Sequence, residues 1–346
     1  MKAGDNILVT GGGGYIGSAL ARTLAKSHAR GVILLDHAEH ELHEIERALR
    51  STEDCIPHTA ILGDICDAAL LAEVFEEYRP QTIYHAAAFK HVAMMERNPL
   101  AAIRNNAFGT LTLVRMAAQF NAKQLVMIST DKAVNPRSVM GVSKRLAELI
   151  LLRFANGSTR MKAVRLGNVL GSRGSVAPLF TEQIARGGPV TVTHADVSRY
   201  FVTLTEAVEI IVAAAKETGA GIFVPQVGEP IKIVDLARQL IKAAGFSPGN
   251  DIGIVFTQLS PGEKLSEEMV SAKESVEAAD DARLRRMKTA ETNVATFDAQ
   301  IRNLARIVER RDLTAFAEAL VCLVPEYEPS ELLLSAKKSL VRAAAK

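Results

Sequence analysis

The sequence predicts an α/β protein with a Rossmann-like doubly wound parallel sheet and a smaller C-terminal lobe that binds the substrate. Three observations support this fold class. In the first half, short runs rich in β-branched residues alternate with helical stretches, which is typical of a parallel sheet covered by helices. A glycine-rich loop at residues 10–17 follows the first of these runs. After about Gly171 the pattern becomes less regular, with glycines and prolines among short segments.

The predicted strands are short apolar runs, as expected for strands that are buried between two layers of helices. They cover Ile7–Thr10, Val32–Leu35, Thr82–His85 and Leu125–Ser129, and Val164–Arg165 marks the end of the next strand. The predicted helices cover Tyr15–Ser27, Ala38–Arg50, Ala68–Glu77, Pro99–Phe120 and Val139–Ala155. From about Ser271 onward the sequence is charged and predicts further helices.

Composition argues against several classes of protein. The 346 residues include 41 Lys+Arg and 39 Asp+Glu, and this balance gives no electrostatic reason to expect nucleic acid as a partner. No apolar run approaches the roughly 20 residues that span a bilayer, and the first residues lack the apolar core of a signal peptide. We therefore expect a cytoplasmic protein that does not insert directly into a membrane.

Neither the cysteines nor the histidines predict a metal site. The cysteines are odd in number and widely spaced, so we interpret them as reduced thiols. They are Cys55, Cys66 and Cys322. His37, His40 and His43 recur every three residues, but no cysteine or paired carboxylate completes a set of ligands. We interpret these histidines as the exposed face of a helix and expect no metal.

The glycine-rich loop predicts a dinucleotide site. Gly11, Gly14 and Gly17 are spaced G-x-x-G-x-x-G between a predicted strand and a predicted helix that opens with Tyr15 and Ile16. Glycines at this turn let the backbone approach a pyrophosphate, which then lies at the helix N-terminus. Asp36 ends the second predicted strand, where a carboxylate binds the adenosine ribose hydroxyls. Because a carboxylate disfavours the 2′-phosphate of NADP, we expect NAD.

Two further segments fit dinucleotide binding. Asp64 and Ile65 follow a third strand, which lies between Val32–Leu35 and Thr82–His85, and there a carboxylate can meet the adenine amino group. Ala86, Ala87 and Ala88 follow the fourth, where small side chains let the backbone pack against a cofactor. Taken alone, the first segment is explained as a helix cap and the second as a packing run.

The stretch after the fifth predicted strand carries acid–base groups. Asp131 and Lys132 lie just beyond the carboxyl end of that strand, where ligands bind in open α/β sheets. Met140 and Lys144 follow within the next predicted helix. An ordinary ion pair in a loop is the alternative interpretation of the Asp131–Lys132 pair.

The chain resembles the extended short-chain dehydrogenase/reductases of the polysaccharide-biosynthesis branch, the UDP-N-acetylglucosamine 4,6-dehydratases. The resemblance covers about residues 5 to 270 and rests on the following segments. They are His85–Val92, Met95–Pro99, Asn105-Asn106 with Gly109-Thr110, Ser129–Pro136, Arg165–Ser175, Arg199–Phe201 and Pro261–Lys264. Such enzymes usually carry Tyr-x-x-x-Lys, and here Met140 stands in place of the tyrosine, as in a subgroup of this branch.

The resemblance implies a dehydration by way of a transient oxidation. Bound NAD removes hydride from C4 of the hexose, the resulting ketone acidifies the C5 proton, and hydride is returned to C6 as water leaves. The resemblance makes Asp131 the acid at the C6 hydroxyl and Lys132 the base at C5. Ser129 and Thr130 bind the C4 oxygen, and Lys144 holds the nicotinamide ribose. Because Met140 replaces the tyrosine and a thioether is only a weak acceptor, the acceptor of the C4 hydroxyl proton stays open, with Thr130 relaying to Asp131 as one route.

The resemblance also implies a set of residues that bind the nucleotide sugar. Those for the UDP moiety are Asn168, Arg173, Ser175, Arg199 and Glu263, with Lys90 orienting the sugar. Ser260 stands where the family usually has an arginine, so one phosphate contact is either missing or supplied by Arg173 or Arg199.

We expect three regions along the chain. Residues 1–170 form the NAD-binding domain, to which roughly residues 200–235 return, residues 171–275 form a nucleotide-sugar-binding lobe, and residues 276–346 form a C-terminal helical extension. The basic tail from Lys337 is expected to be a solvated helix end. Helices near Asn105–Phe120 and Val139–Ala155 are candidates for a four-helix interface in a homodimer or higher homo-oligomer.

Four functions remain open at this stage. The leading hypothesis is a 4,6-dehydratase that retains the configuration at C5, in a pathway for cell-surface polysaccharide or glycan. The same dehydration with inversion at C5 comes next, and no residue separates the two. A nucleotide-sugar 4-epimerase is less favoured, because it needs no acid–base pair for C5 and C6. A non-catalytic sensor of NAD or nucleotide sugar is favoured only by Met140.

Overall fold

A nine-stranded sheet forms the centre of the molecule in the computed structural model, which describes residues 4–288 and 294–335. The strand order is β14-β15-β11-β6-β5-β4-β1-β2-β3. From β3 to β11 neighbouring strands are parallel, and β15 pairs antiparallel with both β11 and β14. The strands are β1 (Asn6–Thr10), β2 (Gly31–Asp36), β3 (His58–Leu62), β4 (Thr82–His85), β5 (Gln124–Thr130), β6 (Arg160–Leu166), β11 (Gly221–Pro225), β14 (Ser275–Ala278) and β15 (Leu284–Lys288). The predicted Rossmann-like fold class is confirmed.

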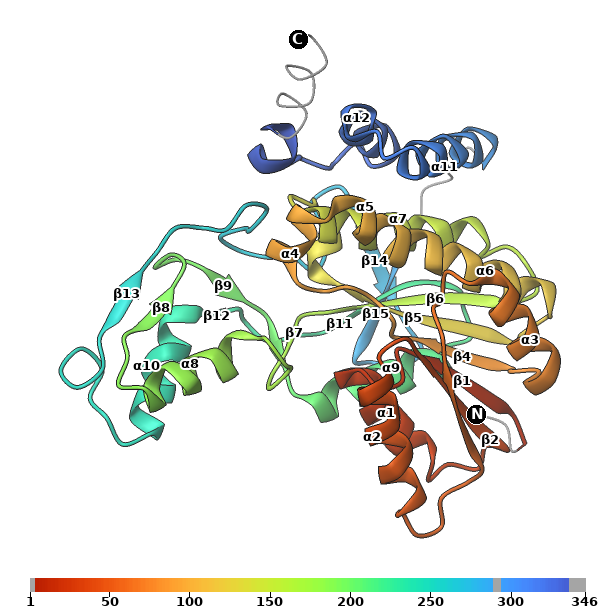
Figure 1. The fold of residues 1–346 in the computed structure, drawn as a ribbon, viewed down its shortest axis with the longest axis horizontal. Helices are drawn as coiled ribbons and strands as arrows, with labels where there is room; N and C mark the ends of the chain where they lie inside the picture. Colours follow the sequence, from red (N-terminus) through yellow and green to blue (C-terminus); the bar gives the residue numbers. More distant parts are fainter. Residues whose placement is uncertain (1–3, 289–293, 336–346) are drawn as a thin grey trace.

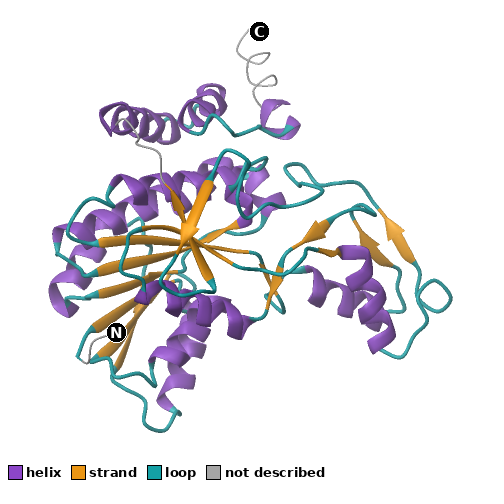
Figure 2. Cartoon of the chain, turned by 180° about the vertical axis from the view of Figure 1, so that it is seen from behind, coloured by secondary structure: helices purple, strands orange, loops and turns teal. Residues whose placement is uncertain are grey.

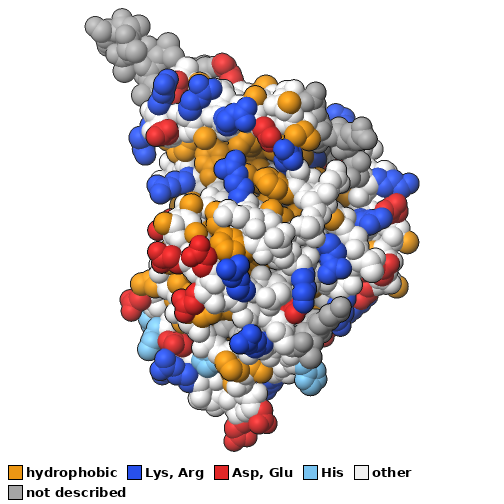
Figure 3. All heavy atoms as spheres, turned by 90° about the vertical axis from the view of Figure 1, so that its right-hand side faces the viewer, with side chains coloured by type: hydrophobic (Ala, Val, Ile, Leu, Met, Phe, Trp, Pro, Cys, Tyr) orange, Lys and Arg blue, Asp and Glu red, His pale blue; other side chains and the backbone are white. Residues whose placement is uncertain are grey.

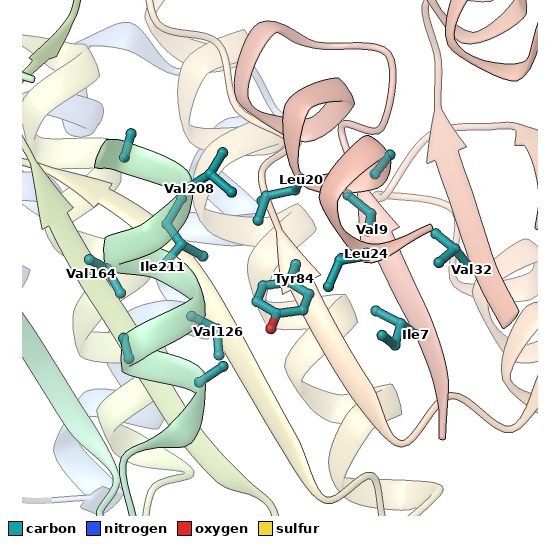
Figure 4. Close-up of a cluster of buried hydrophobic side chains, with 14 of the residues drawn as sticks. Ile7, Val9, Leu20, Leu24, Val32, Tyr84, Val126, Val164, Val208 and Ile211 are labelled. Atoms are coloured by element: carbon teal, nitrogen blue, oxygen red, sulfur yellow. The ribbon is translucent and has the colours of Figure 1, made fainter. Parts of the chain in front are cut away.

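Helices cover both faces of this sheet (Figures 1 and 2). One face packs against α1 (Tyr15–Leu24), α2 (Glu39–Arg50) and α9 (Leu204–Lys216). The other packs against α3 (Ala68–Tyr78), α6 (Thr110–Gln119) and α7 (Val139–Arg153). Figure 4 shows the first of these cores, where Tyr84 of β4 lies among Leu20 and Leu24 of α1 and Val126 of β5. Burying each such aliphatic side chain stabilises the fold by about 1.5–3 kcal/mol.

The predicted helix Pro99–Phe120 is a continuous helical segment with a wider turn inside it. The segment consists of α5 (Pro99–Ala102), a π-helical stretch η1 (Ile103–Gly109) and α6. Asn106 lies in η1. Its Oδ1 accepts a hydrogen bond from the Phe89 amide at 2.8 Å, and its Nδ2 donates to the Phe89 carbonyl oxygen at 2.9 Å. It also donates to Ser143 Oγ of α7 at 2.9 Å. These bonds fasten the wide turn to the loop after β4, and such turns often occur at functional sites.

The expectation that residue 276 begins a helical extension was wrong. The chain forms β14 and β15 there, and helices resume with α11 (Val294–Glu309) and α12 (Leu313–Leu323). In β15 the buried residues are Leu284 and Met287, and Arg286 pairs across the strands with Glu277. Cross-strand ion pairs at an edge of a sheet produce a charged pattern that resembles that of an exposed helix.

A smaller lobe projects from the carboxyl ends of the central strands, on the left in Figure 1. Its core joins α8 (Val176–Ala185) and α10 (Ile233–Ala243) to paired short strands. The strands are β8 (Val190–Val192) with β13 (Ile254–Phe256), β9 (Ser198–Arg199) with β12 (Ile231–Lys232), and β7 (Asn168–Val169) with β10 (Phe201–Val202). Because β7 directly follows β6, this lobe begins at the edge of the main sheet where ligands bind.

Helices α11 and α12 form a third layer over α5, η1 and α7, at the top of Figure 1. Phe297, Leu304 and Leu320 of this layer share a buried cluster with Ile103 of η1 and Ile150 of α7. The face that we expected to mediate a four-helix interface is therefore covered by helices of the same chain. The predicted basic tail from Lys337 lies outside the described residues.

The surface and the helices add two further facts. Acidic and basic side chains are interspersed over the face shown in Figure 3, in keeping with the near balance of charges. Across residues 4–288 and 294–335, no helix is both long enough and apolar enough to cross a membrane.

Candidate active site

A cavity of about 620 Å³ lies at the carboxyl ends of β1, β4 and β5, between the sheet and the smaller lobe. Its wall begins at the glycine-rich loop, passes the segment after β4 and the end of β5, and reaches β7 and the start of α8. Predicted site residues in this wall are Gly11, Gly14, Tyr15, Ile16, Gly17, Ala86, Ala88, Lys90, Ser129, Thr130, Lys132, Met140, Lys144, Asn168 and Ser175. Segments far apart in the sequence are thus brought together at one edge of the sheet.

Two positions of the glycine-rich loop have no room for a side chain. Gly11 has φ +68°, and a Cβ there would lie 2.6 Å from the backbone nitrogen of Ala87. A Cβ on Gly17 would collide with the carbonyl oxygen of Gly11. Gly14 precedes α1 without offering a side-chain cap, so the amides of the first helical turn are left to bind an anion.

Asp36 lies at the neighbouring strand end, in the wall of a smaller cavity of about 150 Å³. Its Oδ2 accepts a hydrogen bond from the Gly13 amide at 2.9 Å, and Oδ1 accepts one from the Ala38 amide at 3.0 Å. Each carboxylate oxygen keeps a further lone pair for ribose hydroxyls. Ile65 and Ala87 also line this cavity, whereas Asp64 turns to the amide of Cys66, at 2.9 Å.

The predicted acid–base pair forms a tight cluster at the end of β5. One helical turn, η2 (Asp131–Ala133), places Lys132 Nζ 2.9 Å from Asp131 Oδ1. The same ammonium donates to Asn168 Oδ1 at 2.9 Å, and Thr130 Oγ1 donates to Asp131 Oδ1 at 2.8 Å. Asp131 is fully buried, and its second oxygen, Oδ2, has no hydrogen-bond partner among the described residues. A buried carboxylate oxygen without a partner is costly unless a ligand supplies one.

Lys144 lies on α7, one turn after Met140, and both side chains are almost completely buried. Burial lowers the pKa of Lys144 to about 8, although the charge of Glu148 acts in the opposite direction. Beneath it, burial and the charge of Lys144 lower the pKa of His85 to about 3. His85 is therefore neutral at physiological pH, and its ring nitrogens bond Thr10 Oγ1 and Thr110 Oγ1 at 2.7 and 2.9 Å.

Glu148 is a buried residue of the site that the sequence analysis missed. It accepts a hydrogen bond of 2.6 Å from Ser129 Oγ, and Arg165 donates to both of its oxygens at 3.0 Å. Burial alone would raise the pKa of Glu148, but Arg165, Arg145 and Ser129 together lower it to about 2. Its only signal in the sequence is an acidic residue within the apolar run of α7.

The predicted substrate residues divide into two groups. Lys90, Asn168 and Ser175 line the cavity, and Ser175 Oγ is buried with no hydrogen-bond partner in the described part of the chain. Burial lowers the pKa of Lys90, whose Nζ donates to the carbonyl oxygen of Arg173 at 2.9 Å. The Arg173 side chain is 79% exposed and pairs with Glu41, which belongs to the cavity wall.

Arg199 and Glu263 pair with each other in the smaller lobe and do not line the cavity. Arg199 Nη2 donates to Glu263 Oε1 at 3.2 Å and to the carbonyl oxygen of Lys264 at 2.8 Å. Thr193 Oγ1 also donates to Glu263 Oε1, at 3.0 Å. The amide of Ser260 donates to the other oxygen of Glu263 at 3.0 Å.

This chain belongs to the polysaccharide biosynthesis protein family, whose model matches residues 7–289. It is 47% identical over 272 residues to the capsular polysaccharide biosynthesis protein CapD of Staphylococcus aureus, which covers 78% of this chain and 45% of CapD. The probable polysaccharide biosynthesis protein EpsC of Bacillus subtilis is 45% identical over 275 residues, or 78% of this chain and 46% of EpsC. The chain thus spans about half the length of these relatives.

A relative of more similar length is the UDP-N-acetylglucosamine 4,6-dehydratase (inverting) of Campylobacter jejuni, 30% identical over 281 residues and 80% of each chain. Among solved structures, Pen from Bacillus thuringiensis matches 88% of this chain and all of its own, with a TM-score of 0.73 and 26% identity. DesIV from Streptomyces venezuelae, a dTDP-glucose 4,6-dehydratase solved with NAD, has a TM-score of 0.66 and 22% identity over 78% of this chain and 89% of its own. At that identity, the similarity to DesIV shows the fold alone.

Proposed function

We propose that this protein is an NAD-dependent 4,6-dehydratase that converts UDP-N-acetylglucosamine to UDP-2-acetamido-2,6-dideoxy-4-keto-hexose, with retention at C5. One observation carries the proposal. An acid and a base, Asp131 and Lys132, lie side by side at the end of β5, next to a cavity that reaches the glycine-rich loop. The product would serve the synthesis of a cell-surface polysaccharide or glycan, as the names of CapD and EpsC suggest for those relatives.

The dinucleotide site fits NAD in shape and in donor chemistry. Gly11 and Gly17 leave no room for a Cβ, and the loop presents helix amides, which suit a pyrophosphate. Asp36 would accept the adenosine ribose hydroxyls, and Lys144 would hold the nicotinamide ribose. When bound, NAD supplies reversible hydride acceptance.

The chain's own residues would move the protons. Lys132 would remove the C5 proton, and Asp131 would protonate the C6 hydroxyl as it leaves. Ser129 already donates its proton to Glu148, so its free lone pairs can accept a hydrogen bond from the C4 hydroxyl. Thr130 donates to Asp131 Oδ1 and would relay the C4 proton to that carboxylate. Met140 would take no part in these proton transfers, because its thioether has no proton to donate.

Binding of the nucleotide sugar would use both lobes. Lys90, Asn168 and Ser175 reach the cavity from two different segments and would hold the sugar and the adjoining phosphate. Arg173 is largely exposed and can exchange its partner Glu41 for the diphosphate, which matches its planar guanidinium. Arg199 and Glu263 would need to rearrange their mutual pairing to contact UDP.

Retention at C5 is favoured because the base is fixed in place. Asp131 and Asn168 both hold Lys132 Nζ, so one amine would remove and return the proton on the same face. The second candidate is the inverting dehydratase, which the name of the Campylobacter jejuni relative favours. An epimerase would leave the Asp131–Lys132 pair without a role at C5 and C6.

Mass spectrometry of the full-length protein with UDP-N-acetylglucosamine, without added NAD, tests the proposal. The expected product is the substrate minus one water, because the bound cofactor is regenerated in each cycle. UDP-glucose and dTDP-glucose, tested in parallel, should react more slowly. An isomer of unchanged mass would indicate an epimerase. Unchanged substrate in every case, even after NAD is added, would contradict the proposal and favour a non-catalytic sensor.

A further inference from the structure

A buried glutamate from a distant part of the chain faces the acid–base pair. Glu267 lies in the segment after β13, and only 4% of its side chain is exposed. Its Oε1 is 3.8 Å from Lys132 Nζ, and its Oε2 is 3.2 Å from Lys264 Nζ. Within residues 4–288 and 294–335, no group donates a directed hydrogen bond to Oε2, so this carboxylate is only partly satisfied by its neighbours.

The segment that carries Glu267 is fastened on both sides of the cavity. Lys264 Nζ donates to the carbonyl oxygen of Val134, in the loop that follows the acid–base pair, at 2.6 Å. The amide of Ser198 in β9 donates to the carbonyl oxygen of Leu265 at 2.9 Å, and Arg165 donates to that of Met269 at 3.0 Å. The position of Glu267 therefore follows from contacts with the sheet and with the smaller lobe.

We propose that Glu267 is a positioning residue for Lys132, an inference that rests on the proposed function. An ammonium has three protons to donate. Asp131 Oδ1 and Asn168 Oδ1 each accept one at 2.9 Å, and Glu267 Oε1 lies 3.8 Å from the same nitrogen, at ion-pair distance. The three oxygens come from three segments and fix the direction in which Lys132 Nζ points.

The four charged groups also balance one another. Asp131 and Glu267 are the acids, and Lys132 and Lys264 are the bases. Lys264 is the counter-ion of Glu267, as Lys132 is of Asp131, so each carboxylate has an amine beside it.

A purely structural role is the competing explanation, since Glu267 also pairs with Lys264. The two roles differ in what they change. Loss of a structural ion pair lowers stability but leaves the pH dependence of turnover unaltered. Loss of a positioning group misplaces Lys132 relative to the substrate, and small displacements of a reacting group lower turnover strongly.

The test compares the full-length variants Glu267→Gln and Glu267→Asp with Glu268→Gln. The last is the matched control, because the neighbouring Glu268 is exposed and bonds Asn135 Nδ2. For Glu267→Gln we expect kcat to fall about 100-fold with KM changed little, and the pH profile of kcat to shift. Glu267→Asp should recover part of the activity, and Glu268→Gln should match the wild type. Turnover and pH profile of Glu267→Gln equal to the wild type would overturn the proposal.

Hydrogen exchange of the free protein separates this inference from the proposed function. Amides of residues 132–134 should exchange faster in Glu267→Gln than in the wild type and in Glu268→Gln, whether or not a substrate is known. If the wild type dehydrates no nucleotide sugar, the proposed function is wrong. The exchange measurement still shows whether Glu267 contacts the segment that carries Lys132. Unchanged exchange at residues 132–134 in Glu267→Gln would contradict the contact itself.

Discussion

Met140 and Lys144 lie one helical turn apart on α7, and both side chains line the cavity at the carboxyl ends of the central strands. Burial lowers the pKa of Lys144 to about 8, but Met140, one turn before it on α7, has no exchangeable proton. We therefore propose that the chemistry is done by the cluster at the end of β5, where Asp131, Lys132 and Thr130 are hydrogen-bonded together.

Replacing the acid or the base should abolish dehydration. We expect Asp131→Asn and Lys132→Ala each to lower kcat by about 10²–10⁴-fold, the usual contribution of a general acid or base. Bound NAD, measured after release from the purified variants, should equal that of the wild type, because neither residue belongs to the glycine-rich loop. Full turnover in one variant would remove that residue from the mechanism.

Met140→Leu should be tolerated. Leucine has a similar volume and is equally unable to move a proton, so kcat should stay within about 3-fold of the wild type, and stability within about 1.5 kcal/mol. Steady-state kinetics and urea unfolding measure the two quantities. A loss of turnover with normal stability would show that the thioether itself takes part in the reaction.

The buried pair of Glu148 and Arg165 should make stability depend on pH. Arg165 keeps the pKa of Glu148 near 2 in the folded chain despite its burial, below its ordinary value of 4.5. Because the folded-state pKa is lowered, the stabilisation is complete above pH 4.5 and is lost as the pH falls toward 2. In urea unfolding at neutral pH, Glu148→Gln should cost about 3–5 kcal/mol, because Arg165 is left as an unpaired buried charge.

Glu328→Gln is the control for that experiment, since Glu328 forms an exposed ion pair with Arg137. It should change the free energy of unfolding by less than about 1 kcal/mol. If the wild type and Glu148→Gln differ by the same amount at pH 3 as at pH 7, the assignment of the low pKa to Glu148 is wrong.

The layer formed by α11 and α12 should contribute to the stability of the whole chain. Leu320→Ala removes a fully buried side chain of α12 and should lower the free energy of unfolding by about 2–5 kcal/mol. The adjacent Val321 is 38% exposed, so Val321→Ala should change it by less than about 1 kcal/mol. Equal effects of the two substitutions would show that this layer is not packed against α7 in solution.

Local sequence patterns predicted the strands and the glycine-rich loop, because residues close together in the sequence determine these parts. The strands that end at Thr10, Asp36 and His85 are marked by apolar runs, and the glycine-rich loop by its spacing. Interactions over long sequence distances were not predictable in this way. The bond from Ser129 to Glu148 and the approach of Glu267 to Lys132 depend on how separate segments pack.

Charge patterns misled the prediction where strands and helices produce similar sequences. The segment around Glu277 and Arg286 is charged because β14 and β15 pair at the edge of the sheet, not because it is helical. Arg199 and Glu263 were assigned to the substrate from the resemblance alone, and their mutual pairing in the smaller lobe could not be read from the sequence.

Proton NMR of the full-length protein with UDP-N-acetylglucosamine in D₂O, without added NAD, tests the central claim most directly. We predict a new methyl signal from a 6-deoxy sugar, with deuterium at C5 introduced by the base and ring couplings that report retention. Couplings of the opposite C5 configuration would assign the inverting dehydratase. A spectrum without a 6-deoxy methyl signal, even after NAD is added, would contradict the assignment of Asp131 and Lys132 as a dehydrating pair.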